Sequence, residues 1–227
     1  MIMKLVLNGS NILQGTSPLP LPGPKTICVF CGARSGNDES FIDAATELGD
    51  AIGLEGMALL YGGGAEGLMG AVARAAAEHG SLVTAVMPRF LADRIPMLAA
   101  PHEMVIVPDM HTRKRIMFER ADAFVALPGG IGTIEELTEI VTLHKLEQQR
   151  KPLVFANVKG FWEPLLQLFS HLERSGFISD DLMSKCLVAD TPNAILPMLR
   201  GFSADAVEHA ANAVSPAWRH GNSWKRH

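Results

Sequence analysis

The segment 121–144 constrains the fold of this chain more than any other, because it joins a short apolar run to a helical pattern through a glycine-rich turn. Residues 121–126 predict a buried strand, and the apolar spacing from Ile134 onward predicts a helix. The turn at 128–133 is Pro-Gly-Gly-Ile-Gly-Thr. Free backbone N–H groups and the helix dipole favour an anion there, so the turn could bind a phosphate. A tight turn with a capping threonine and helix-start acids is the plainer interpretation.

The same alternation of strand and helix continues along most of the chain. Strands are predicted at 26–30, 57–61, 82–87, 104–107, 124–127, 153–155 and 186–188, with helices over 38–54, 68–79, 109–120 and 162–173 and an irregular stretch at 88–101. This pattern predicts an α/β fold, a Rossmann-like doubly wound parallel sheet with helices on both faces. Three glycine-rich turns, at 32–36, 62–67 and 129–132, follow strands, so we expect them to meet at the ligand-binding edge of the sheet.

Composition and the chain ends narrow the class of protein. We expect one Rossmann-like domain over 25–202, a flexible proline-rich arm over 1–24, and a C-terminal helix with a frayed tail over 203–227. A net charge of −4 gives no reason to expect nucleic acid or an anionic membrane as a partner. No apolar run approaches the ~20 residues of a membrane span, and no export signal is apparent, which indicates the cytoplasm.

Several common sites are disfavoured by spacing. Cys28 and Cys31 form a C-x-x-C pair, but residues three apart on a strand face opposite sides, so we expect buried core cysteines. The eight histidines lack zinc-site spacing, so no metal is expected. The run Gly62-x-Gly64-x-x-Gly67 matches a dinucleotide fingerprint, yet no acid follows about 20 residues later. A P-loop is also absent.

The predicted helix 109–120 carries a dense positive run, and Asp109 can cap it. Cations at a helix start oppose the dipole, and the plain interpretation is a solvated face. However, Arg113 shares a face with Met110 and Met117, which we expect to be buried. An arginine on such a face near the ligand edge is expected to meet a carboxylate or phosphate.

Two motifs together resemble the signature of the LOG (Lonely Guy) family, cytokinin riboside 5′-monophosphate phosphoribohydrolases long labelled lysine decarboxylase-like. They are Met110-His-x-Arg-Lys-x-x-Met117 and Pro128-Gly-Gly-x-Gly-Thr-x-x-Glu136, and the resemblance extends over about residues 27–188. It includes Val29-Phe-Cys-Gly32, Tyr61 to Gly70, and Met87-Pro88.

The resemblance implies a Rossmann-like homodimer that cleaves the N-glycosidic bond of an adenosine 5′-monophosphate, usually N6-prenylated, without cofactor or metal. It implies that Arg113 and Glu136 are catalytic. The implied or associated nucleotide and phosphate contacts are Gly32, Ser35, Gly62, Gly63, Gly64, Met87, Lys114, Gly129, Gly130, Ile131, Gly132, Thr133, Glu135 and Thr142. The chain departs from the family at Ala33, Arg34, Leu143 and Lys145, so the N6 substituent is not predicted.

The chemistry of base release suits these two residues. Breaking a ribosyl–adenine bond builds positive charge on the sugar, which a carboxylate such as Glu136 can stabilise while activating water. Arginine is a poor acid, so we expect Arg113 to orient Glu136 and bind the substrate. A decarboxylase would need pyridoxal phosphate and a Schiff-base lysine, and only Lys114 is expected near the site. The alternative is a non-catalytic nucleotide-binding or carrier protein on the same fold.

Overall fold

The computed structural model describes residues 25–96, 102–148, 150–179 and 186–202. Within these ranges seven strands form one sheet in the order β4-β3-β2-β1-β5-β6-β7, and every neighbouring pair is parallel. The strands are β1 (Thr26–Phe30), β2 (Ala58–Tyr61), β3 (Val83–Pro88), β4 (Glu103–Val107), β5 (Ala123–Ala126), β6 (Leu153–Ala156) and β7 (Cys186–Ala189). The predicted Rossmann-like α/β fold is confirmed. The predicted arm at 1–24 and tail at 203–227 lie outside the described residues.

Helices connect the strands. They are α1 (Glu39–Leu54), α2 (Gly67–Glu78), α3 (Arg89–Ala92), α4 (Met110–Arg120), α5 (Ile131–Lys145), the 3-10 turn η1 (Val158–Gly160), α6 (Glu163–Arg174) and α7 (Pro192–Gly201). As predicted, Asp109 caps α4, accepting a hydrogen bond from the Thr112 backbone N–H at 2.7 Å.

Three expectations about helices need correction. The helix α5 begins at Ile131 and not at Ile134, so Glu135 and Glu136 lie in its second turn. Part of the stretch expected to be irregular, 89–92, is helical. The helix α7 was not predicted, because Pro197 inside it is a helix breaker in isolation, whereas its packing against α1 and the sheet holds it.

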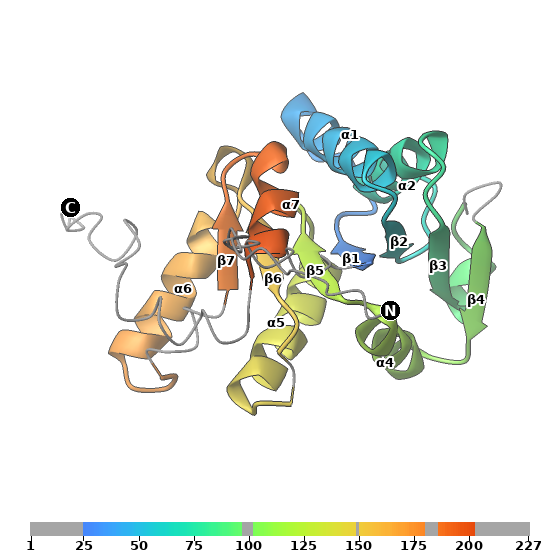
Figure 1. Cartoon of the computed structure of the whole chain (residues 1–227). Helices are drawn as coiled ribbons and strands as arrows, with labels where there is room; N and C mark the ends of the chain where they lie inside the picture. Colours follow the sequence, from blue (N-terminus) through green and yellow to red (C-terminus); the bar gives the residue numbers. More distant parts are fainter. Residues whose placement is uncertain (1–24, 97–101, 149, 180–185, 203–227) are drawn as a thin grey trace, which may run out of the picture.

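Helices cover both faces of the sheet (Figure 1). One face carries α1, α2 and α7, and the other carries α4, α5 and α6. The two cysteines of the C-x-x-C pair separate as expected, with Cys28 in the core under α4, α5 and α6 and Cys31 in the opposite core. Burial raises the pKa of both thiols well above the usual range, which makes them unreactive. No helix in the described ranges is long and apolar enough to cross a membrane.

The centre of the sheet is the point where the chain changes direction. Strands β1 and β5 are neighbours, but β1 leads into α1 on one face and β5 leads into α5 on the other. The loops that leave these two strands therefore diverge and open a crevice at the carboxyl edge of the sheet. In open α/β sheets this crevice is the usual ligand site.

Candidate active site

A cavity of about 510 Å³ occupies this crevice. Two loops supply much of its lining, residues 31–37 after β1 and residues 128–130 after β5. Arg113 of α4 and Glu136 of α5 also line it. Its volume lies within the range of small-molecule sites, and its lining mixes charged groups with apolar side chains.

Arg113 and Glu136 form a buried ion pair in the cavity. The Arg113 Nη2 lies 3.3 Å from the Glu136 Oε1, and the side chains are 7% and 4% exposed. The Met110 sulfur lies 3.7 Å from the Arg113 Nη1. The Arg113 Nε is buried and has no hydrogen-bond partner among the described residues. Because an unpaired buried donor is unfavourable, a ligand oxygen could satisfy it.

Burial controls the charge of Glu136. Desolvation raises the pKa of Glu136 to about 7, while the nearby Arg113 charge acts in the opposite direction. Glu135 raises this pKa further, and Lys114 lowers it. A carboxyl group with a pKa near neutrality can both accept and donate a proton under physiological conditions, which is the property of a general acid–base group.

The amino terminus of α5 opens into the same cavity. Gly130 is its N-cap residue, and no side chain caps it. A Cβ atom added at Gly130 or Gly132 would meet nothing within 4 Å, so packing does not require glycine at either position. Both glycines line the cavity, together with the buried Thr133. An uncapped helix start with open space in front of it is suited to a phosphate or carboxylate.

The glycine turn before α2 is arranged differently. The Leu68 and Met69 backbone N–H groups donate to the Gly32 carbonyl at 3.1 and 3.3 Å. A Cβ atom at Gly62 would strike the Arg113 guanidinium, and one at Gly63 would lie 2.8 Å from the Met87 methyl carbon. The protein itself fills the space around this turn. The glycines of the G-x-G-x-x-G run are therefore needed for close packing within the protein. They leave no room for a dinucleotide pyrophosphate.

The structure brings together half of the site residues that the sequence indicates. Those that line the cavity are Gly32, Ser35, Arg113, Gly129, Gly130, Gly132, Thr133 and Glu136. Those that do not line it are Gly62, Gly63, Gly64, Met87, Lys114, Ile131, Glu135 and Thr142.

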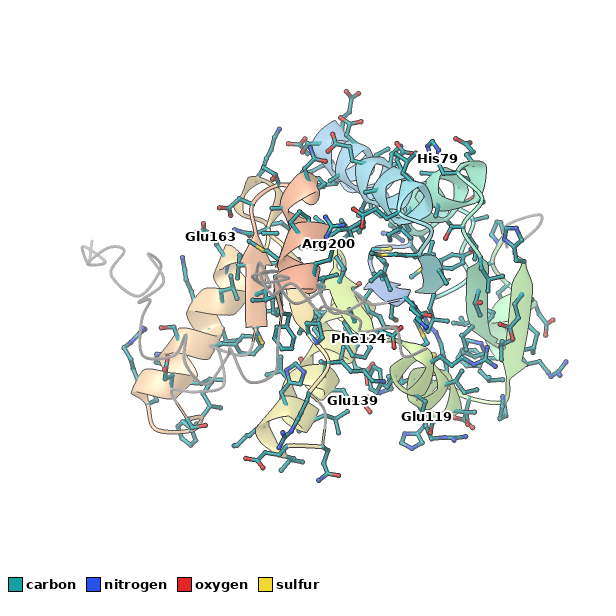
Figure 2. The ribbon with its side chains drawn as sticks, in the orientation of Figure 1. His79, Glu119, Phe124, Glu139, Glu163 and Arg200 are labelled. Carbon is teal, nitrogen blue, oxygen red and sulfur yellow. The ribbon has the colours of Figure 1, made fainter. Side chains whose placement is uncertain are left out.

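The second group has identifiable surroundings. Lys114 forms ion pairs with Glu135 and Glu139, and Figure 2 labels Glu139 on α5. Ile131 is 81% exposed. Thr142 donates to the Thr138 carbonyl at 2.7 Å on an exposed part of α5. It lies about 16 Å along the helix from Ile131, as follows from a rise of ~1.5 Å per residue.

Sequence reasoning missed several residues that line the cavity. The cavity is also lined by the loop residue Asn37 and by Phe41, Met69 and Phe161. Met110 lines it too; this residue was expected to be buried and is half-buried. Phe41 lies within the predicted helix 38–54. Gly36, which has a φ of +81° and packs against the Phe41 ring, was the available signal that this loop folds back over the helix. Phe161 gave no signal in its local sequence.

Neither a metal nor pyridoxal phosphate fits the described residues. No group of three or more His, Cys, Asp or Glu side chains that could hold a metal ion is found among them. No lysine from the described ranges lines the cavity, and Lys114 is held by two glutamates of α5. A Schiff-base enzyme would need a lysine with access to its ligand.

Comparisons with known proteins agree with this picture. A family model described as "Possible lysine decarboxylase" matches residues 69–199. The chain is 41% identical over 184 residues to the probable cytokinin riboside 5′-monophosphate phosphoribohydrolase LOGL1 of Oryza sativa subsp. japonica, covering 81% of this chain and 82% of that protein. It is 42% identical to the phosphoribohydrolase LOG7 of Arabidopsis thaliana, covering 75% and 77%.

Solved structures share the fold. The molybdenum cofactor carrier protein of Chlamydomonas reinhardtii superposes with a TM-score of 0.60 at 21% identity, covering 78% of this chain and 96% of that chain. The molybdenum cofactor binding protein of Rippkaea orientalis gives 0.59 at 20% identity, covering 78% and 95%. At these identities the likeness concerns the fold alone.

Proposed function

We propose that this chain, which belongs to the LOG family of cytokinin riboside 5′-monophosphate phosphoribohydrolases, hydrolyses the N-glycosidic bond of an adenosine 5′-monophosphate, with or without an N6 substituent. The products are the free base and ribose 5-phosphate. The observation that carries the proposal is the placing of a buried Arg113–Glu136 pair and an uncapped helix start in one cavity.

Glu136 is the reacting carboxylate. As the bond from C1′ to the base nitrogen breaks, the electron pair leaves with the base and positive charge develops on the ribose. The ionised Glu136 stabilises that charge and takes a proton from the water that attacks C1′. The proton that Glu136 takes from the water is passed to the departing base, so the overall change is the addition of one water across the bond, with the hydroxyl on C1′ and the hydrogen on the base.

Arg113 has two roles in this scheme. Its Nη2 holds the Glu136 carboxylate at 3.3 Å and favours the ionised form against the effect of burial. Its unpartnered Nε is available for an oxygen of the ribose or phosphate. Gly62 supports this placement, because a side chain there would occupy the position of the guanidinium.

The phosphate belongs at the start of α5. Gly130 and Gly132 leave their backbone open to the cavity, and the buried Thr133 adds a hydroxyl beside them. Among the other candidate contacts, Lys114 and Glu135 would reach a ligand only if their ion pair opened. In the scheme proposed here their mutual pairing fixes α4 against α5, which keeps Arg113 opposite Glu136.

The test is release of base. Purified protein is incubated with AMP and with N6-isopentenyl-AMP, and free adenine or N6-isopentenyladenine is measured by liquid chromatography. We expect many turnovers per protein molecule. A carrier protein would instead bind one nucleotide per chain and release it unchanged, and that result would end the hydrolase proposal.

The phosphate contacts predict a substrate preference. The kcat/KM for AMP should exceed that for adenosine by at least ~10²-fold, because two or three charge-assisted contacts of ~1.5–3 kcal/mol each are lost without the phosphate. Binding energy from a remote phosphate also positions the reacting sugar. Equal kcat/KM values for AMP and adenosine would contradict the proposal that the start of α5 binds the substrate phosphate.

We also propose that the enzyme is a cytoplasmic homodimer, as the family resemblance implies. Light scattering coupled to size exclusion would measure the mass of the particle in solution, and cell fractionation would locate it. A monomer of full activity would contradict the dimer proposal without affecting the chemistry.

A further inference from the structure

Two aromatic side chains line the cavity and have no part in the chemistry described above. Phe41 lies near the start of α1, and Phe161 follows η1 after β6. Their ring centroids are 5.4 Å apart with an interplanar angle of 78°, an edge-to-face contact between segments far apart in the sequence. Phe161 also packs edge-to-face on Trp162. We call Phe41 and Phe161 the aromatic wall.

An ion pair beside the aromatic wall joins the same two segments. The Lys159 Nζ lies 2.9 Å from the Asp38 Oδ2 and 3.1 Å from its Oδ1. Asp38 also accepts the Ser40 backbone N–H at 3.0 Å and so caps α1, the helix that carries Phe41. The Lys159 hydrogen bonds lower the pKa of Asp38 to about 2, with a smaller contribution from Ser40. Asp38 is therefore ionised at neutral pH.

Lys159 holds an unfavourable backbone conformation. Its φ of 50° and ψ of 32° lie in the left-handed region, which lysine seldom adopts. Such strain persists only where the surrounding structure fixes it, and it is concentrated at functional sites. Here the lysine, two residues before Phe161, pairs with Asp38, three residues before Phe41.

Two other apolar side chains of the cavity lie beside the Arg113–Glu136 ion pair. Met110 contacts Arg113, and Met69 packs against Gly62 and Gly64 beside the guanidinium. Phe41 and Phe161 instead contact each other, with Gly36 and Trp162 as neighbours. The phosphate and ribose need polar partners, whereas a planar base with an apolar substituent is best placed on aromatic rings.

From this arrangement we propose that the aromatic wall receives the leaving base and its apolar N6 substituent, and that the Asp38–Lys159 ion pair is the positioning element that sets the wall. Phe41 and Phe161 then determine specificity among N6-substituted nucleotides. This inference rests on the hydrolase function proposed above, since it assigns a part of the same cavity to a part of the same substrate.

The test is the ratio of kcat/KM for N6-isopentenyl-AMP to kcat/KM for AMP. Phe161→Ala and Phe41→Ala should each lower this ratio at least tenfold, on the scale of ~10–200-fold for apolar groups in a pocket. Phe161→Leu, which keeps apolar bulk, covers the case in which an alanine variant does not fold, and it should lower the ratio by a smaller factor. Phe177→Ala is the matched control, because Phe177 is 74% exposed and outside the cavity lining.

The positioning role has its own variants. Lys159→Gly accepts the left-handed backbone but removes the charge, and it should raise the KM for N6-isopentenyl-AMP several-fold while kcat for AMP stays within twofold. Lys159→Arg should restore the wild-type KM. A purely structural role for Lys159 would change thermal stability and leave the two substrates equally affected.

Each failure has a distinct signature. If the wild type releases base from AMP but the substrate ratio is unchanged in both alanine variants, the aromatic wall does not contact the base and this inference is wrong. If the wild type releases no base from either nucleotide, the hydrolase function fails instead. In that case calorimetry of both nucleotides with Phe161→Ala still tests the wall, and equal loss of affinity for both would overturn it.

Discussion

Two glycine-rich turns of this protein each follow a parallel strand and begin a helix, yet they have different uses. The turn at 62–67 starts α2, and the Gly32 carbonyl accepts the Leu68 and Met69 N–H groups at its start. The turn at 129–132 starts α5, whose first residues face the cavity without a side-chain cap. One helix start is used by the fold, and the other is left for a ligand.

The difference lies in what surrounds each glycine. A Cβ atom at Gly67 would lie 2.5 Å from the Ala33 carbonyl carbon, and φ there is +56°. A Cβ atom at Gly132 would meet no atom within 4 Å. A glycine with no room for a side chain, such as Gly67, is required by the packing of the fold. A glycine in open space beside a helix start indicates a site where something outside the protein must approach the backbone closely.

The largest expected effect concerns Glu136, the proposed reacting carboxylate on α5. Glu136→Gln should reduce turnover of AMP by ~10²-fold or more, the scale of a general acid–base group, while AMP affinity changes by only a few-fold. Single-turnover base release and calorimetry measure the two quantities separately. Glu119→Gln, on the exposed end of α4 that Figure 2 labels, is the control and should be fully active. Near-normal turnover in Glu136→Gln would remove this carboxylate from the mechanism.

The next effect concerns the α2 turn. Gly67→Ala should destabilise the fold by about 2–4 kcal/mol, because it adds a left-handed backbone cost to a clash with the Ala33 backbone. Gly80→Ala separates these causes, since Gly80 has a φ of +80° but no neighbour within 4 Å of a Cβ. Its cost should be about 1 kcal/mol. Urea denaturation measures both, and equal losses would mean that the close approach at Gly67 does not matter.

A smaller effect is expected at the α5 turn itself. Gly132→Ala should leave the free energy of unfolding unchanged or slightly raised, because alanine favours helix by up to ~1 kcal/mol over glycine. AMP affinity should fall about tenfold, since the methyl group enters the space in front of the phosphate-binding backbone, at ~1.4 kcal/mol per factor of ten. Calorimetry on a variant of normal stability measures the loss. Unchanged affinity would place the phosphate elsewhere and make the two glycine turns alike.

The smallest effect is on pH dependence. If the ionised Glu136 is the active form, kcat/KM should fall as the pH drops through about 7, the raised pKa of this group. Glu139 contributes a small part of that increase. Glu139→Gln should therefore lower the pKa of Glu136 and move the acidic limb of the profile to lower pH by a few tenths of a unit. A shift to higher pH would contradict this assignment, because the loss of the Glu139 charge and a Lys114 relieved of one partner should both lower the pKa of Glu136.

The fold followed from the sequence to a large extent, because the decisive signals were local. Seven apolar runs separated by helical patterns leave few alternatives to a parallel sheet. Within the described residues every predicted strand is present, with shifts of one residue at several ends. The helix α7 escaped prediction because tertiary packing outweighs the effect of Pro197, and packing is not visible in a short window.

The candidate site followed in part. The Arg113 pattern predicted an arginine that meets a carboxylate or a phosphate, and the structure places the Glu136 carboxylate against it. Which glycines face a cavity could not be predicted, because the carbonyl that occupies the start of α2 comes from Gly32, in the loop after β1. For the same reason the contact between Phe41 and Phe161 had no local signal.

The ion pairs of Lys114 have a consequence for how such a chain can diverge over evolutionary time. Arg113 and Lys114 are neighbours on α4, and they meet Glu136, Glu135 and Glu139 on α5. Substitutions in these two segments should therefore depend on one another, although about twenty residues separate them in the sequence. In the proposed mechanism positions 113 and 136 are fixed by chemistry, whereas positions 114, 135 and 139 can change only together. A lineage that replaced Lys114 by a neutral residue would leave two acids beside Glu136, and selection would then favour the loss of an acid at 135 or 139.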